Sequence, residues 1–197
     1  MKINYHKKMQ EIINNLSHKP RLLLHSCCAP CSSHCIEELK DNFALSIFYY
    51  NPNIYSQEEF EKRLLEQKRL IKEMDLDIDI ISPEYDPSEF SDISKGLEEL
   101  SEGNARCYKC YLLRLRKTAE TAKNNNYDFF TTTLSVSPLK NAEWLNQIGF
   151  ELEKELGIKF LPSDFKKKGG YLRSIELSRK YNLYRQNFCG CIFSKKD

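Results

Sequence analysis

The amino-acid sequence predicts an α/β fold, a single-domain Rossmann-like parallel sheet flanked by helices, with a helical C-terminal part. The Rossmann-like part of this prediction rests on the order of the segments along the chain. Short apolar runs alternate along the chain with longer segments whose apolar residues recur at helical spacing, and such alternation is typical of parallel strands joined by crossover helices. A length of 197 residues with 41% hydrophobic residues also predicts one domain, residues 1–197, around one core.

Five segments have the composition of buried strands. They are short runs of apolar, aromatic or β-branched residues that end in turn residues, as at Asn51-Pro52-Asn53. The predicted strands are 21–25, 44–50, 76–81, 127–133 and 158–161.

The segments between these strands are predicted to be mainly helical. Ser56 with Glu58 and Glu59 is typical of a helix start, because a serine oxygen and acidic groups satisfy the first amide groups. The predicted helices are 3–16, 31–41, 56–74, 106–124, 141–156 and 174–181, with an acidic loop at 83–104 and a flexible basic loop at 166–170.

Unusual polar turns follow three of the predicted strands. Cys27 and Cys28 come after the first strand, Asn51-Pro52-Asn53 after the second, and 135–138 after the fourth. Ligands of open parallel sheets bind outside the carboxyl ends of the strands. The sequence therefore predicts a functional site at this edge of the sheet.

Composition narrows the class of protein. The net charge of +2 does not indicate a nucleic-acid binder by bulk charge, although local basic clusters can still serve one. We expect no secretory signal in 1–10 and no membrane span, and therefore a cytoplasmic protein whose thiols stay reduced. Eight cysteines in that compartment are typical of ligands or catalysts.

Four of the cysteines suit an inorganic centre. Cys107-x-x-Cys110 alone is compatible with zinc, an iron–sulfur cluster or a dithiol centre. The adjacent pair Cys27-Cys28 is unusual for tetrahedral zinc, whereas a cluster accepts two neighbouring thiolates on different irons. A 4Fe-4S cluster on all four is predicted. A zinc-stabilised tRNA-binding or tRNA-thiolating protein, and a thioredoxin-like dithiol exchanger, stay open as alternatives.

Cys189-Gly-Cys191 is a second kind of cysteine motif, a candidate redox-active pair. The single glycine gives the backbone freedom to bring the two sulfurs together. A disulfide in so small a ring is expected to be strained, and strained disulfides are the redox-active ones. Zinc ligation or two idle thiols is the alternative.

Three cofactor chemistries lack their motifs. The radical-SAM pattern that begins at Cys27-x-x-x-Cys31 would need a third cysteine where His34 stands. The turn after the first strand has no glycines for close approach to a pyrophosphate, so no ATP is expected. No Asp-x-His-x-x-Gly motif is present, so no cobalamin is expected.

Five motifs in a fixed order carry a resemblance to a known family. They are His25-Ser-Cys-Cys-Ala-Pro-Cys31, Tyr50-Asn-Pro-Asn53, Cys107-Tyr-Lys-Cys110, Thr131-Thr-Thr-Leu-Ser-Val-Ser-Pro138 and Tyr184-Arg-Gln-Asn-Phe-Cys-Gly-Cys191. Together they closely resemble the epoxyqueuosine reductases of the QueH type. The resemblance implies a HUP-like α/β fold and an oxidoreductase that reduces epoxyqueuosine to queuosine at the wobble base of tRNA.

The resemblance also implies roles for individual cysteines. It implies a 4Fe-4S cluster on Cys27, Cys28, Cys107 and Cys110, and a redox-active disulfide between Cys189 and Cys191. It further implies an additional mononuclear iron beside the cluster, for which Cys31 is our predicted ligand. The electron donor is not identified by the sequence, and Cys35 matches no family motif.

Recognition of tRNA is expected to use basic and aromatic residues near the site, because cations bind phosphates and aromatic rings stack on unpaired bases. Tyr184 or His25 is also predicted to donate a proton. The candidate tRNA contacts are Lys166, Lys167, Lys168, Arg173, Tyr184 and Arg185, with Arg114, Arg116 and Lys117 as a second patch and Tyr50 and Tyr171 as further aromatics.

Overall fold

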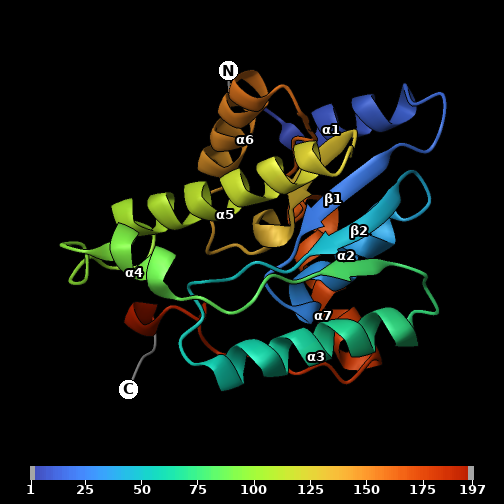
Figure 1. Ribbon diagram of the computed structural model, residues 1–197. Helices are drawn as coiled ribbons and strands as arrows, with labels where there is room; N and C mark the ends of the chain where they lie inside the picture. Colours follow the sequence, from blue (N-terminus) through green and yellow to red (C-terminus); the bar gives the residue numbers. More distant parts are fainter. Residues whose placement is uncertain (1–2, 195–197) are drawn as a thin grey trace.

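The computed structural model describes residues 3–194, and a five-stranded parallel sheet lies at its centre (Figure 1). The strands are ordered β3-β2-β1-β4-β5, so the chain winds outward from β1 in both directions. This is the predicted Rossmann-like architecture. The strands are β1 (Arg21–His25), β2 (Ala44–Phe48), β3 (Asp79–Ile81), β4 (Phe129–Thr132) and β5 (Lys159–Phe160).

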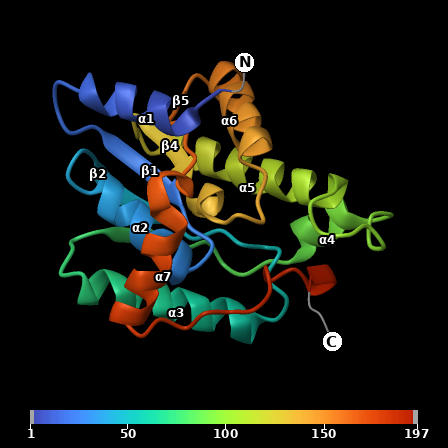
Figure 2. The same cartoon turned by 180° about the vertical axis from the view of Figure 1, so that it is seen from behind.

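Helices cover both faces of the sheet. Figure 1 shows α5 and α6 over one face, and Figure 2, from behind, shows α1, α2 and α7 over the other. The helices are α1 (Tyr5–Asn14), α2 (Ala29–Leu39), α3 (Gln57–Glu73), α4 (Ser88–Ser94), α5 (Ala105–Asn124), α6 (Ala142–Leu156) and α7 (Gly170–Lys180).

The central strand β1 is apolar on both sides, as a strand between two helical layers must be. Leu23 packs with Leu115 of α5 and Ile148 of α6. Leu22 and Leu24 point the other way, into a cluster with Ile36 of α2. Because successive side chains of a strand alternate between faces, the run Leu22-Leu23-Leu24 joins both halves of the core.

The boundaries of several elements differ from the prediction. α2 begins at Ala29, because Pro30 fits the first turn and Cys28 takes the N-cap position. β3 is confined to Asp79–Ile81, since the amide of Leu76 still bonds to the carbonyl of Ile71 at the end of α3. The strand therefore starts three residues later than the predicted start at Leu76.

The segment predicted as a flexible basic loop is ordered secondary structure. Lys167–Gly169 forms a 3-10 turn, and Gly169 at φ 82° leads into α7, which begins at Gly170 rather than at Ser174. The basic side chains therefore lie on a structured turn at the start of α7.

Close packing at the start of α7 leads to a stability prediction. Gly170 has helical φ, −59°, so alanine there causes no backbone strain. A Cβ atom at this position would lie 1.9 Å from the carbonyl oxygen of Phe165 and 2.5 Å from His34 Nε2. We expect Gly170→Ala to lower the free energy of unfolding by about 3 kcal/mol, measured by chemical denaturation.

Gly103→Ala is the matched control for this prediction. Gly103 has φ +91° but no atom within 4 Å of its Cβ position, so the substitution costs backbone strain alone, about 1 kcal/mol. Equal losses for the two variants would contradict the packing argument.

Candidate functional site

Three turns meet at the carboxyl edge of the sheet. The amide of Ser26 donates to the carbonyl of Phe48 at 3.0 Å, and Asn51 Nδ2 donates to the carbonyl of Ser26 at 2.9 Å. Cys27 Sγ lies 3.8 Å from Thr133 Oγ1, just beyond β4. The predicted convergence of these turns is confirmed, and Asn51 holds two of them together.

A group of three thiols occupies the turn between β1 and α2. The sulfur atoms of Cys27, Cys28 and Cys31 all lie within 4.8 Å of one another, and those of Cys27 and Cys28 are 3.7 Å apart. We call this group the thiol triplet. It forms because Cys28 caps α2 and Cys31 follows within the first turn, so the helix winds the third sulfur back toward the first two.

The thiol triplet favours one negative charge. Hydrogen bonds from Cys28 and then Cys31 hold the pKa of Cys27 well below its usual range, with the positive charge of Arg114 acting in the same direction against burial. The same hydrogen bond to Cys27 raises the pKa of Cys28. Of the three thiols, Cys27 is therefore the one that most favours the thiolate form.

Arg114 of α5 is a buried cation beside the thiol triplet, with 2% of its surface exposed. Its Nη2 donates to Asn51 Oδ1 at 2.7 Å, its Nε donates to His25 Nε2 at 3.3 Å, and its Nη1 lies 3.9 Å from Cys110 Sγ. The prediction that Arg114 joins Arg116 and Lys117 in a surface patch is wrong, because these interior partners take up its guanidinium group.

His25 is a neutral structural residue. It is fully buried, and its Nδ1 lies 2.9 Å from Thr132 Oγ1. Burial and then the charge of Arg114 lower the pKa of His25 to about 3. The structure does not support His25 as a proton donor, because its ring is fully buried and its nitrogens already contact Thr132 Oγ1 and Arg114 Nε.

Four of the remaining cysteines, Cys107, Cys110, Cys189 and Cys191, lie on the α5 side of the site, whereas Cys35 is buried in α2. Cys107 accepts a hydrogen bond from the amide of Gly103 at 3.3 Å, and Cys110 packs with Cys191 and Phe90. Cys189 accepts a hydrogen bond from Lys140 Nζ at 3.1 Å, and both Cys189 and Cys191 are free thiols. Cys107 and Cys110 are not part of the thiol triplet, so the four-cysteine ligand set stays a prediction.

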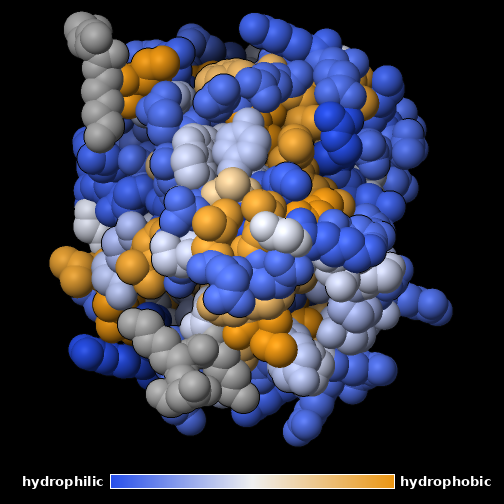
Figure 3. Space-filling view, turned by 90° about the vertical axis from the view of Figure 1, so that its left-hand side faces the viewer, coloured by the Kyte–Doolittle hydropathy of each residue, from blue (hydrophilic) through white to orange (hydrophobic). Residues whose placement is uncertain are grey.

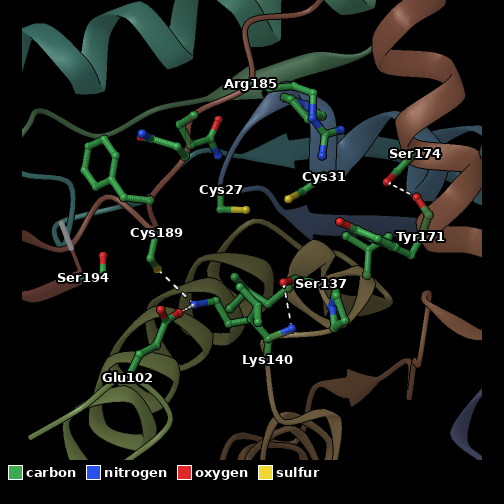
Figure 4. A pocket seen from close by; sticks show the side chains of 18 of the residues that line it. Cys27, Cys31, Glu102, Ser137, Lys140, Tyr171, Ser174, Arg185, Cys189 and Ser194 are labelled. Atoms are coloured by element: carbon green, nitrogen blue, oxygen red, sulfur yellow. Dashed lines mark hydrogen bonds and ion pairs between the residues drawn. The ribbon is translucent and has the colours of Figure 1, made fainter. Parts of the chain in front are cut away.

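A pocket of about 710 Å³ lies between the thiol triplet and Cys189 (Figure 4). Figure 4 shows the sulfur atoms of Cys27 and Cys31 on one side and Cys189 with Lys140 on another. Arg114, the turn 134–140, Tyr171 of α7 and the segment 185–189 complete the walls. A ligand in this pocket can therefore contact Cys27 and Cys31 of the thiol triplet as well as Cys189.

The surface at one end of the sheet is partly apolar. Figure 3 shows hydrophobic side chains gathered near the middle of this face with hydrophilic ones around them. Leu139, which lines the pocket, is 72% exposed. An exposed leucine that lines the pocket is available for contact with a flat apolar group such as a nucleobase.

The predicted tRNA contacts are only partly near the pocket. Arg185 and Tyr171 line it, and Arg185 Nη1 donates to Ser178 Oγ at 3.0 Å. Lys167 and Lys168 are exposed but do not line it, and Arg173 is paired with Glu37 at 2.7 Å.

Two of the predicted aromatic contacts are engaged elsewhere. The hydroxyl group of Tyr184 donates to Glu59, and Lys62 lies over its ring. The hydroxyl group of Tyr50 donates to Glu89 at 2.7 Å. Neither residue lines the pocket.

Sequence reasoning missed two charged residues of the site, Lys140 and Glu102. Lys140 Nζ donates to Glu102 Oε1 at 2.6 Å as well as to Cys189. The sequence did offer one indication for Lys140. It lies directly after the turn that follows β4, at the edge of the sheet where the functional site was predicted. Glu102 has no such signal, because it lies in the loop before α5.

A pocket lined by Cys27, Cys31 and Cys189 at the carboxyl edge of a Rossmann-like sheet is typical of an enzyme that uses thiol chemistry, as many oxidoreductases do. The sequence model of the family described as epoxyqueuosine reductase QueH matches residues 22–197. The chain belongs to this family, as the motifs indicated.

Individual relatives agree over nearly the full chain. The epoxyqueuosine reductase QueH of Staphylococcus epidermidis is 39% identical, covering 98% of this chain and 85% of the relative. That of Streptococcus pyogenes is 36% identical, covering 99% and 79%. That of Thermotoga maritima is 35% identical, covering 88% and 89%.

A solved structure shares the fold. The U34-tRNA thiolase NcsA from Methanococcus maripaludis, solved with its 4Fe-4S cluster, gives a TM-score of 0.56 at 12% identity, covering 98% of this chain and 67% of that chain. This likeness concerns the fold alone, and it agrees with the expected Rossmann-like α/β sheet. None of the helices within residues 3–194 is both long and apolar enough to span a membrane.

Proposed function

We propose that the protein reduces the epoxide of epoxyqueuosine in tRNA to give queuosine. Membership of the epoxyqueuosine reductase family carries the proposal, and the thiol-lined pocket of about 710 Å³ supports it. The reaction removes one oxygen as water and consumes two electrons and two protons. A dithiol that becomes a disulfide releases two electrons and two protons, and Cys189 with Cys191 is the proposed pair.

The proposed cofactor is a 4Fe-4S cluster held by Cys27, Cys28, Cys107 and Cys110, with Cys31 as ligand of an additional iron. Cys27, Cys28 and Cys31 support the proposal, because their sulfurs lie within 4.8 Å of one another and Cys27 favours the thiolate form that binds metal. Arg114, between the thiol triplet and Cys110, offsets the negative charge that thiolates bring. When bound, the cluster supplies single-electron transfer.

The residues of the chain orient and shield the substrate. Leu134, Val136 and Leu139 give the pocket an apolar wall, while Arg185 offers a cation beside it. Lys140, which contacts both Cys189 and Glu102, is placed to hold or release a proton near the dithiol. The wall thus combines apolar contact for a base with a cation for a phosphate.

The proposed tRNA surface extends from the pocket along α7. Lys167, Lys168 and Arg173 lie on or just before the first turns of this helix, and Tyr171 lines the pocket. Tyr184 and Arg185 follow on the next segment. A separate electron donor must reduce the protein after each turnover, since the chain itself supplies only a fixed number of electrons.

The test is conversion of epoxide-bearing tRNA. Anaerobically purified protein is incubated with the tRNA and dithionite, and the nucleosides are analysed by mass spectrometry. We expect a product that is lighter by one oxygen atom, with Cys189→Ser inactive. An unchanged nucleoside, or a sulfur-containing product formed by protein that holds zinc without iron, would contradict the proposal and favour tRNA thiolation.

A further inference from the structure

Lys140 is a largely buried ammonium group in the wall of the pocket. Its side chain is 9% exposed, and its Nζ lies 2.6 Å from Glu102 Oε1 and 3.1 Å from Cys189 Sγ. Figure 4 shows the three side chains in a row, with Lys140 in the middle. The fixed acceptor on one side leaves the ammonium aimed at the sulfur on the other.

The two cysteines of the pair have different surroundings. Cys189 lines the pocket, and its carbonyl accepts a hydrogen bond from Arg63 Nη1 at 3.3 Å. Cys191 is buried with Cys110 and Phe90 and does not line the pocket. Burial raises the pKa of Cys191, so Cys191 stays a thiol.

The charged and titratable groups around Cys189 come from several elements. Burial alone would lower the pKa of Lys140, but the negative charges of Cys189, Tyr111 and Glu102 raise it, so the ammonium form is held. The remaining groups that act on this region are Arg63 of α3, Cys110 and Arg114 of α5, Cys191, and Arg106, which acts on Cys191.

We infer that Lys140, anchored by Glu102, is a positioning residue whose ammonium contact with Cys189 makes this cysteine the reacting sulfur of the pair. An ammonium in contact with sulfur stabilises the thiolate, which is the nucleophilic form. Cys191 is then the buried partner that closes the disulfide. The use of this pair in epoxide reduction rests on the proposed function, whereas the assignment of the reacting sulfur does not.

The test is the rate of alkylation of each cysteine, measured on the reduced full-length protein with iodoacetamide and peptide mass spectrometry. The sulfur forms a bond to carbon while the carbon–iodine bond breaks and iodide leaves. In the wild type we expect Cys189 to react at least tenfold faster than Cys191 at pH 7. Lys140→Met should slow Cys189 at least tenfold and move its rate profile to higher pH, while Lys140→Arg should restore most of the rate.

Two further variants separate charge from structure. Glu102→Gln should shift the profile of Cys189 by less than Lys140→Met does, because the ammonium keeps its charge but loses its anchor. Lys109→Met removes an exposed charge from α5 and should leave the profile unchanged.

The inference is overturned if folded Lys140→Met has the wild-type profile, or if its rate falls at every pH without a shift. It is equally overturned if Lys140→Arg behaves like Lys140→Met. Alkylation does not depend on tRNA turnover, so failure of the proposed reductase activity would appear as unconverted tRNA with these rates intact.

Discussion

Replacing Cys27 with serine is expected to abolish both iron binding and turnover. Cys27 is the member of the thiol triplet that favours the thiolate, and it lies within 4.8 Å of both of the other sulfurs. A serine hydroxyl stays protonated and is a poor ligand for iron. The loss should exceed the roughly 10–100-fold cost of removing an outer-shell partner, measured as iron and sulfide content and as visible absorbance after anaerobic reconstitution.

Parallel serine variants then determine the ligand set. If Cys27, Cys28, Cys107 and Cys110 hold the cluster, Cys107→Ser should lose it and Cys31→Ser should retain it. The opposite pattern would mean that the thiol triplet holds the cluster and that Cys107 does not. Either pattern would identify the cysteines that hold the cluster. The two variants are comparable because Cys31 and Cys107 are both partly exposed.

Cys35→Ser is the matched control for these variants. Cys35 is fully buried in α2, and its thiol donates to the carbonyl of Cys31 at 3.3 Å, a bond that serine can also make. It should keep its iron and its activity. Normal iron content in Cys27→Ser would contradict the assignment of this turn as the cluster site.

The edge of the sheet that carries the site was predictable because local sequence determines it. Leu22-Leu23-Leu24 indicates a strand with two covered faces, and the cysteines follow that strand directly. Once the sheet is parallel, the turns after β1, β2 and β4 must share an edge. Topology therefore brings Asn51 to Ser26 without any further information from the sequence.

The charged residues of the site were not predictable in the same way. Arg114 lies one helical turn after Cys110, but its burial depends on Asn51 and His25, which lie far away in the chain. Lys140 meets Cys189 across 49 positions. Sequence periodicity identifies the face of a helix, whereas only the packed structure determines which partner that face meets.

Replacing Arg114 with methionine is expected to destabilise the protein strongly even without any cofactor. Methionine keeps the unbranched apolar stem but leaves Asn51 Oδ1 without the donor that lies 2.7 Å from it, and removes the cation beside Cys27 and Cys110. A buried acceptor left unpaired costs about 1–3 kcal/mol, and breaking a buried charged network costs about 3–5 kcal/mol. We therefore expect a loss of about 3 kcal/mol in denaturant unfolding of the reduced apoprotein.

Arg116→Met provides the control two residues along the same helix. Arg116 is paired with Glu155 at 2.6 Å on the surface, and such a pair contributes about 1 kcal/mol or less. Arg114→Lys should recover only part of the loss, because an ammonium cannot reproduce the planar fork that reaches both Asn51 and His25. Equal stability of Arg114→Met and Arg116→Met would show that the buried guanidinium does not hold the two thiol-bearing sides of the site together.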